Sequence, residues 1–64
     1  MVTINGTKRN MAGKTVAEYL DIAGYDPRCI AVEYNGNILP KASYAAAVLK
    51  DGDEVEVVRF VGGG

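Results

Sequence analysis

Two Asn-Gly dipeptides, Asn5-Gly6 and Asn35-Gly36, constrain the fold of this chain more than any other feature. Each lies between short segments that contain β-branched and aliphatic residues. Asparagine and glycine tolerate the positive φ that both central positions of a type I′ turn require, so each dipeptide predicts a tight β-hairpin. The first hairpin joins residues 2–4 to residues 7–11, and the second joins 29–35 to 37–39.

The segment between the two hairpins carries the signals of one main helix. Thr15 and Glu18 have the spacing of a capping box, which marks the first turn of a helix. Gly24 suits the left-handed position that ends a helix, and Pro27 prevents the helix from resuming. Residues at i, i+4 and i+7, with one aromatic residue beside them, form the expected buried stripe: Val16, Leu20, Ala23 and Tyr19.

The last third of the chain predicts a short helical segment followed by a final strand. Residues 42–49 are rich in alanine and indicate a short helix or a 3-10 turn, with Tyr44 and Val48 on one face. Asp51-Gly52-Asp53 predicts a tight turn. Residues 54–61 then begin with alternating acidic residues and valines, which predicts a strand with its first two valines facing inward.

This order of elements predicts an α+β roll, in which a mixed four- to five-stranded sheet packs on one main helix. Because parallel strands are normally covered on both faces, the two apolar terminal strands are expected to pair in parallel. A chain of 64 residues buries about 60% of its surface on folding, which is enough for one domain. We place that domain at residues 1–61 and a flexible glycine tail at residues 62–64.

Composition argues against several functional classes. Seven Lys and Arg against eight Asp and Glu leave no basic excess to neutralise phosphates, so no nucleic-acid partner is expected. No apolar run approaches the roughly 20 residues of a membrane span, so we expect no membrane partner and a cytoplasmic location. The chain has no histidine and is too short to form both a core and a walled pocket, so we expect no enzyme activity.

Three local motifs have structural interpretations. Gly13-Lys14-Thr15 resembles the end of a phosphate-binding loop, but that loop needs a glycine where this chain has Lys8, so a turn and helix cap are favoured. Cys29 has no neighbouring cation or histidine to activate it, which favours a small core residue over a nucleophile. The acids of residues 51–56 lack the ligand spacing of a calcium loop, and we expect no metal site.

The chain ends in three consecutive glycines, Gly62, Gly63 and Gly64. Backbone without Cβ atoms can thread a narrow channel, so the terminal carboxylate could be a substrate for another protein; a frayed end without function is the alternative. From Val61 to Gly64 the tail spans at most about 11 Å at ~3.6 Å per residue. Phe60 precedes this tail and could either anchor a partner or be buried in the last strand.

Taken together, these features resemble the ThiS family of ubiquitin-like sulfur carriers, and the resemblance covers nearly the whole chain. It rests on the first Asn-Gly hairpin, Gly13 to Val16, Ile30 to Gly36, Ile38 to Lys41, Tyr44, Leu49 to Asp53, Val55 to Val58 and the terminal Gly63-Gly64. The resemblance implies a β-grasp fold.

The resemblance also implies a chemistry for the tail. The carboxylate of Gly64 would be adenylated by a ThiF-type enzyme that uses ATP and Mg²⁺, while this chain itself binds no cofactor and has no catalytic residue. Sulfur derived from cysteine through a desulfurase would displace AMP and leave a thiocarboxylate, which a ThiG-type thiazole synthase would consume. From their own properties and positions, Gly62 and Gly63 are expected to thread the partner's channel, and Phe60 and Val61, just before them, to contact the partner.

Two other functions stay open. A carrier of the molybdopterin-synthase small-subunit type would use the same tail for another acceptor, but such subunits are typically longer and often have prolines shortly before the terminal glycines. The last proline of this chain is Pro40. A non-covalent β-grasp binding module would keep all its partner-dependent activity after deletion of Gly64.

Overall fold

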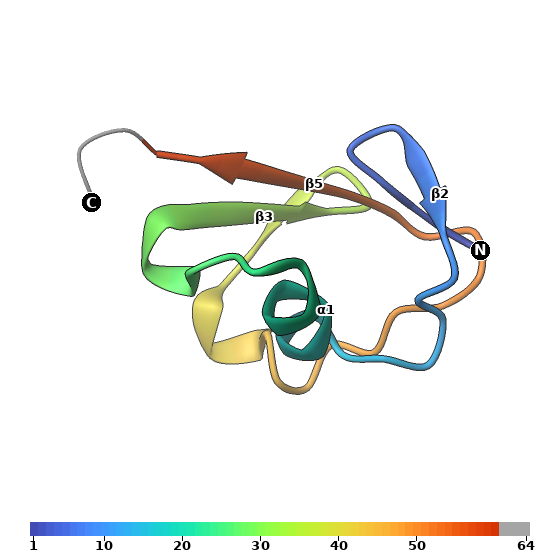
Figure 1. The fold of residues 1–64 in the computed structure, drawn as a ribbon, viewed down its shortest axis with the longest axis horizontal. Coiled ribbons are helices and arrows are strands. Elements are labelled where there is room, and N and C mark those ends of the chain that lie inside the picture. The colour runs from blue at the N-terminus through green and yellow to red at the C-terminus, as the bar shows by residue number, and fades with distance from the viewer. Residues whose placement is uncertain (61–64) are drawn as a thin grey trace.

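The computed structural model describes residues 1–60. Its elements, in chain order, are β1 (Val2–Ile4), β2 (Thr7–Arg9), α1 (Val16–Ala23), the 3-10 helix η1 (Pro27–Cys29), β3 (Ile30–Tyr34), β4 (Asn37–Leu39), the 3-10 helix η2 (Lys41–Ser43) and β5 (Glu54–Arg59). Figure 1 shows that α1 and both 3-10 helices lie on the same side of the sheet. The opposite face of the sheet carries no helix within residues 1–60.

The five strands form one mixed sheet in the order β2-β1-β5-β3-β4. β1 and β5 run parallel, with Thr3 opposite Glu54 and Ile4 opposite Val55, while the other neighbouring strands are antiparallel. The mixed five-stranded sheet on one main helix confirms the predicted roll, and the parallel pair confirms the predicted contact between the first and last strands. Within residues 1–60, no helix is long and apolar enough to cross a membrane.

Both predicted hairpins and the predicted helix start are confirmed. Asn5 and Asn35 have φ values of 51° and 50°, and each is followed by a glycine with positive φ, as a type I′ turn requires. Thr15 caps α1 in a capping box: its hydroxyl accepts the Glu18 N–H, and the Glu18 carboxylate accepts the Thr15 N–H. Gly24 ends the helix in the left-handed conformation.

The core lies between the inner face of the sheet and α1. Its buried residues come from β1, α1, β3, β5 and the segment after η2: Val2, Ile4, Val16, Tyr19, Leu20, Ile30, Val32, Tyr44, Leu49 and Val55. Ala23 is exposed, so this part of the predicted stripe is wrong. The residue has the right helical phase, but it ends α1 and borders an open hollow with Arg9 and Met11 instead of the core.

Of the two forms predicted for residues 42–49, the 3-10 turn is confirmed: it lies at Lys41–Ser43 and is followed by turns. Two predicted side-chain positions in the second half of the chain are wrong. Val48 does not share the buried face of Tyr44, because its backbone forms a bridge with Thr15 and its side chain is exposed. Cys29 ends η1 and is only half-buried, so it is not a core residue.

β5 ends at Arg59, two residues earlier than predicted. The inward side chain of Val55 is buried and that of Val57 is half-buried, while Glu54 and Glu56 are exposed, as the alternation predicts. Val61 and the glycines at 62–64 lie outside the described residues. The predicted boundary between the domain and its tail therefore stays a prediction.

Two neighbouring positions on α1 test the core. Leu20→Ala removes a fully buried side chain and is expected to lower the free energy of unfolding by about 2–5 kcal/mol. Ile22→Ala is the matched control, because this aliphatic residue of the same helix is 57% exposed; we expect a loss within about 0.5 kcal/mol. Urea denaturation measures both, and similar losses would contradict the described orientation of α1.

Candidate functional site at the end of β5

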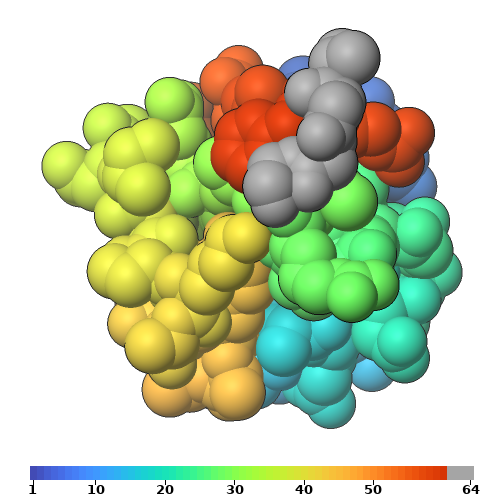
Figure 2. Space-filling model, turned by 90° about the vertical axis from the view of Figure 1, so that its left-hand side faces the viewer, coloured from blue at the N-terminus to red at the C-terminus, as the bar shows by residue number. Residues whose placement is uncertain are grey.

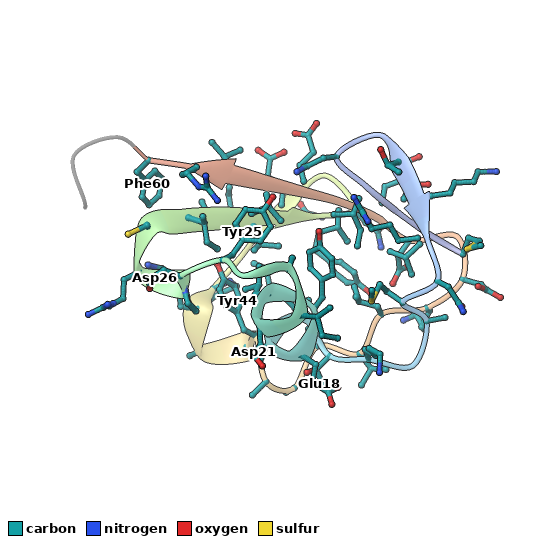
Figure 3. All side chains as sticks on the ribbon, in the orientation of Figure 1. Glu18, Asp21, Tyr25, Asp26, Tyr44 and Phe60 are labelled. Carbon is teal, nitrogen blue, oxygen red and sulfur yellow. The ribbon has the colours of Figure 1, made fainter. Side chains whose placement is uncertain are left out.

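β5 is the element that leads to the predicted tail. It pairs with β3 over its last five residues, from Val55 opposite Tyr34 to Arg59 opposite Ile30. The N–H of Phe60 then donates to the carbonyl of Cys29 at 2.8 Å, which extends this pairing one residue beyond the strand. Figure 3 shows Phe60 beyond the end of β5, at one end of the molecule. The described chain is therefore held by backbone hydrogen bonds up to the residue before Val61.

A buried carboxylate holds the opposite end of β5. Asp53 is only 7% exposed and immediately precedes the strand. It accepts hydrogen bonds from the Tyr34 hydroxyl, from Asn35 Nδ2 at 3.2 Å and from the Lys50 N–H at 2.9 Å. These bonds join the 50–53 turn to the end of β3, so the start of β5 has a defined position.

The same contacts set the protonation of this cluster. Burial raises the pKa of Asp53, but the hydrogen bonds from Tyr34, Lys50 and Asn35 together outweigh it and lower the pKa below its ordinary value. The hydrogen bond to Asp53, with burial and the negative charge of the carboxylate, raises the pKa of Tyr34 to about 12. At neutral pH the cluster is therefore an ionised Asp53 carboxylate that accepts a hydrogen bond from the neutral Tyr34 phenol.

The asparagines of the two turns also hold β5 in place. Asn35 exchanges hydrogen bonds with Glu54: its N–H donates to the Glu54 carbonyl, and its Oδ1 accepts the Glu54 N–H, both at 2.8 Å. In the first turn, the Asn5 N–H donates to the Val55 carbonyl at 2.9 Å, and Asn5 Oδ1 accepts the Val57 N–H at 2.8 Å. Sequence reasoning assigned both asparagines to the turns alone and missed this second role.

Side chains around the end of β5 are open to a partner. Phe60 is 41% exposed, as the anchor interpretation requires, although its contact with a partner stays a prediction. Val58 is 48% exposed, and the Arg59 guanidinium carbon lies 5.3 Å from the centroid of the Tyr25 ring. Figure 2 looks onto this end of the molecule, where β5 in red lies beside the yellow-green β3–β4 hairpin.

The helix-free face of the sheet is acidic. Glu33 on β3 is directly opposite Glu56 on β5, and Glu54 is opposite Thr3. These residues line one shallow depression together with Gly6, Gly36 and Val55. Among the residues that the structure describes, no group of three potential ligands could hold a metal ion. The acids give this face a negative surface charge beside the first half of β5.

The segment that resembles a phosphate-binding loop is engaged with its own chain. The Gly13 N–H donates to the Leu49 carbonyl and the Leu49 N–H donates to the Lys14 carbonyl, both at 2.8 Å. With Thr15 as the helix cap, this confirms the interpretation as a turn followed by a helix start.

Comparison with known proteins gives one consistent family. The chain matches the model of the ThiS family over residues 2–64. It is 38% identical to the sulfur carrier protein ThiS of Thermus thermophilus over the whole of both chains. A crystal structure of the thiamine biosynthesis protein ThiS from Geobacter metallireducens superimposes with a TM-score of 0.78 at 34% identity, covering 98% of this chain and 97% of that one. This similarity confirms the β-grasp fold.

The chain is also similar to one segment of a longer protein, a thiazole synthase. The chain is 48% identical, over 98% of its length, to a segment of the thiazole synthase of Paramagnetospirillum magneticum. The matched segment is 20% of that synthase, so the chain spans about one fifth of its length.

The Asp53–Tyr34 cluster predicts how stability depends on pH. Because the folded-state pKa of Asp53 is lowered, its contribution is present above the ordinary pKa of about 3.9 and is lost as the pH falls through the lower folded value. Asp53→Asn is therefore expected to cost about 1–3 kcal/mol at pH 7 and progressively less below about pH 4. Asp21→Asn, the same change at an exposed helix position, is the control and should cost under about 0.5 kcal/mol.

At alkaline pH, stability changes in the opposite direction: it falls as the pH rises. The raised pKa of Tyr34, about 12, contributes stability that is present below the ordinary tyrosine pKa of about 10 and is lost as the pH rises through 12. Tyr34→Phe should remove this loss. Urea denaturation across the pH range measures both effects, and a constant difference between wild type and Asp53→Asn from pH 7 to pH 2 would refute the described cluster.

Proposed function

The chain belongs to the ThiS family, and on that premise we propose that it is a sulfur carrier of thiamine biosynthesis whose C-terminal carboxylate carries the sulfur. The observation that carries the proposal is the match to a sulfur carrier over the whole length of both chains. The position of β5 supports it, because the strand leads to the terminal glycines from one end of the molecule.

The proposed chemistry requires activation by another protein. A carboxylate is a poor electrophile, so a ThiF-type enzyme would transfer AMP from ATP to the Gly64 carboxylate and release pyrophosphate. Mg²⁺ and the cations of that enzyme would stabilise the charge that develops on the phosphates. Sulfur that a desulfurase removes from cysteine as a persulfide would then attack the carbonyl and displace AMP, and a thiol reductant would cleave the S–S bond to leave a thiocarboxylate on Gly64.

The carrier contributes position and tethering. A tail of at most about 11 Å, at ~3.6 Å per residue from Val61 to Gly64, allows the carboxylate to enter a partner's site while the folded body stays outside. Gly62 and Gly63 provide backbone without Cβ atoms for the narrow part of this path. Covalent attachment keeps the sulfur bound and raises its concentration at the next site.

A thiazole synthase is the proposed acceptor. In the Paramagnetospirillum protein that bears this name, a segment similar to this chain belongs to the same polypeptide as the synthase. This physical linkage favours a ThiG-type acceptor over the acceptor of a molybdopterin-type carrier. We propose no bound cofactor and no catalytic residue for the chain itself, and a cytoplasmic location stays a prediction.

Intact-protein mass spectrometry tests the proposal. The chain is incubated with ATP, Mg²⁺, a ThiF-type enzyme, a cysteine desulfurase, cysteine and a thiol reductant, and the expected product has one oxygen replaced by sulfur at Gly64. A chain that lacks Gly64 is the control, because its terminus is one residue short of the reacting carbonyl. If the shortened chain still supports all partner-dependent activity, the chain is a non-covalent binding module.

Adding each acceptor system to the loaded carrier separates the two carrier types. We expect thiazole formation with the ThiG-type synthase. Transfer of sulfur only to a molybdopterin precursor would contradict the proposed pathway.

Phe60 tests the proposed partner surface. Phe60→Ala is expected to weaken binding to the ThiF-type enzyme about tenfold, because an exposed aromatic residue beside the tail can act as an interface anchor. We expect the thermal midpoint to change little, since the side chain is not part of the buried core. Val48→Ala, an exposed apolar position in the segment after η2, lies outside β5 and is the binding control. Equal losses in affinity and in stability for Phe60→Ala would count against the contact.

A further inference from the structure

β5 changes from a central strand to an edge strand along its length. β1 pairs with it only at Glu54 and Val55, whereas β3 continues alongside as far as Arg59. Figure 1 shows β5 running on past the β1–β2 hairpin. From Glu56 onward, the side of β5 that faces away from β3 has no partner strand within residues 1–60.

Hydrogen bonds at the two ends of the β3–β5 ladder show which backbone groups face this edge. The Glu54 carbonyl accepts from Asn35, and the Phe60 N–H donates to Cys29, so the even-numbered residues of β5 direct their polar groups toward β3. Because these groups alternate along an antiparallel strand, the N–H and carbonyl of Arg59 point away from β3.

At the start of the same edge, the backbone groups already have hydrogen-bond partners. The Val55 carbonyl accepts the Asn5 N–H, and the Val57 N–H donates to Asn5 Oδ1. The side chain of Asn5 thus completes the edge where β1 ends. Beyond it, the Val57 carbonyl and the two backbone groups of Arg59 face the unpaired side, an arrangement that can accept an added strand.

A hollow of about 340 Å³ lies on the helical side of the sheet, between β2 and α1. It is lined by Arg9, Met11, Tyr19, Ile22, Ala23 and Tyr25. The Tyr25 ring also lies under the Arg59 guanidinium, which places one end of the hollow beneath the free edge. Since side chains of a strand alternate between the two faces of a sheet, an added strand would direct every second side chain toward this hollow.

The face of the sheet without helices determines which side chains would suit the added strand. Val58 is an exposed apolar side chain, and Glu56 and Glu33 are opposite each other on the same face of the sheet. An added strand would therefore gain from a basic side chain near Glu56 and an apolar one near Val58.

The length of the chain after β5 limits which partner protein can pair with the free edge of β5. The five steps from the Cα of Arg59 to that of Gly64 span at most about 18 Å at ~3.6 Å each, so any protein that receives the terminal carboxylate must lie near the free edge.

We propose that an extended segment of the activating enzyme adds to the sheet along the free edge of β5, with its carbonyls and N–H groups paired to Val57 and Arg59. The segment carries a basic residue on the acidic face and an apolar residue toward the hollow. This inference rests on the proposed function, because it takes the enzyme that adenylates the tail as its partner. Strand addition would align the tail with that enzyme before any chemistry occurs.

Arg59→Pro tests the proposal, with Arg59→Ala as its matched control. Proline has no N–H, and its ring blocks the free edge, while the bonds of Val58 and Phe60 to β3 stay possible. Both variants lose the guanidinium, so only proline acts on the backbone. Binding to the ThiF-type enzyme without ATP should be about tenfold or more weaker for Arg59→Pro than for Arg59→Ala, since the lost bonds are backbone hydrogen bonds. Equal affinities would overturn the proposal.

Amide hydrogen exchange keeps the test decisive if Arg59→Pro folds poorly. In the wild-type carrier the Arg59 amide should exchange rapidly when free and about tenfold or more slowly in the complex, because strand addition gives it a carbonyl partner. Unchanged exchange in the complex would overturn the proposal. So would a dimer of the free carrier, seen by sedimentation, that Arg59→Pro abolishes, because the occupant would then be a second copy.

Mass spectrometry separates failure of this inference from failure of the proposed function. If wild-type carrier gains sulfur at Gly64 and the two Arg59 variants bind equally, only strand addition is wrong. If wild-type carrier gains no sulfur, the proposed function is wrong as well.

Discussion

The unequal pairing of β5 with its two neighbours is the constraint on which the rest of the molecule depends. β3 holds the strand over its last five residues, and β1 holds it only at Glu54 and Val55. The first contact gives the strand a rigid base for whatever follows it. The second leaves one side of its end accessible. A longer β1 would have covered this edge, and a shorter β3 would have left the end of β5 without support.

Polar side chains fix this arrangement where the strand begins. The buried Asp53 carboxylate joins the 50–53 turn to Tyr34 and Asn35, and Asn35 also exchanges hydrogen bonds with Glu54. Because a buried charge is costly without hydrogen bonds, this cluster is stable only in one arrangement of the surrounding backbone. The start of β5 and the second hairpin are therefore fixed relative to each other. Because β5 is a continuous strand, the position of its start also determines where its end lies.

Much of the fold could be predicted from local patterns. The type I′ turns follow from the restricted φ of their central residues, and the start of α1 follows from the Thr15–Glu18 spacing. The prediction of burial failed where the spacing of a residue along its own element did not decide whether its side chain is buried. Ala23 has the phase of a buried residue but borders a hollow, and Val48 was placed on one face with the buried Tyr44 but is exposed. In both cases the neighbours that decide exposure are distant in sequence.

By itself, the sequence determined the hairpins, the main helix, the inward face of the last strand and the family to which the chain belongs, because each is encoded in residues close together or in their order. Only the tertiary structure decided that Asn5 and Asn35 hold β5, that Asp53 is buried beside Tyr34, and that the end of β5 is a free edge above a hollow. Those features depend on where one strand ends relative to another. Strand register and length arise from packing across the whole domain, and no local pattern specifies them.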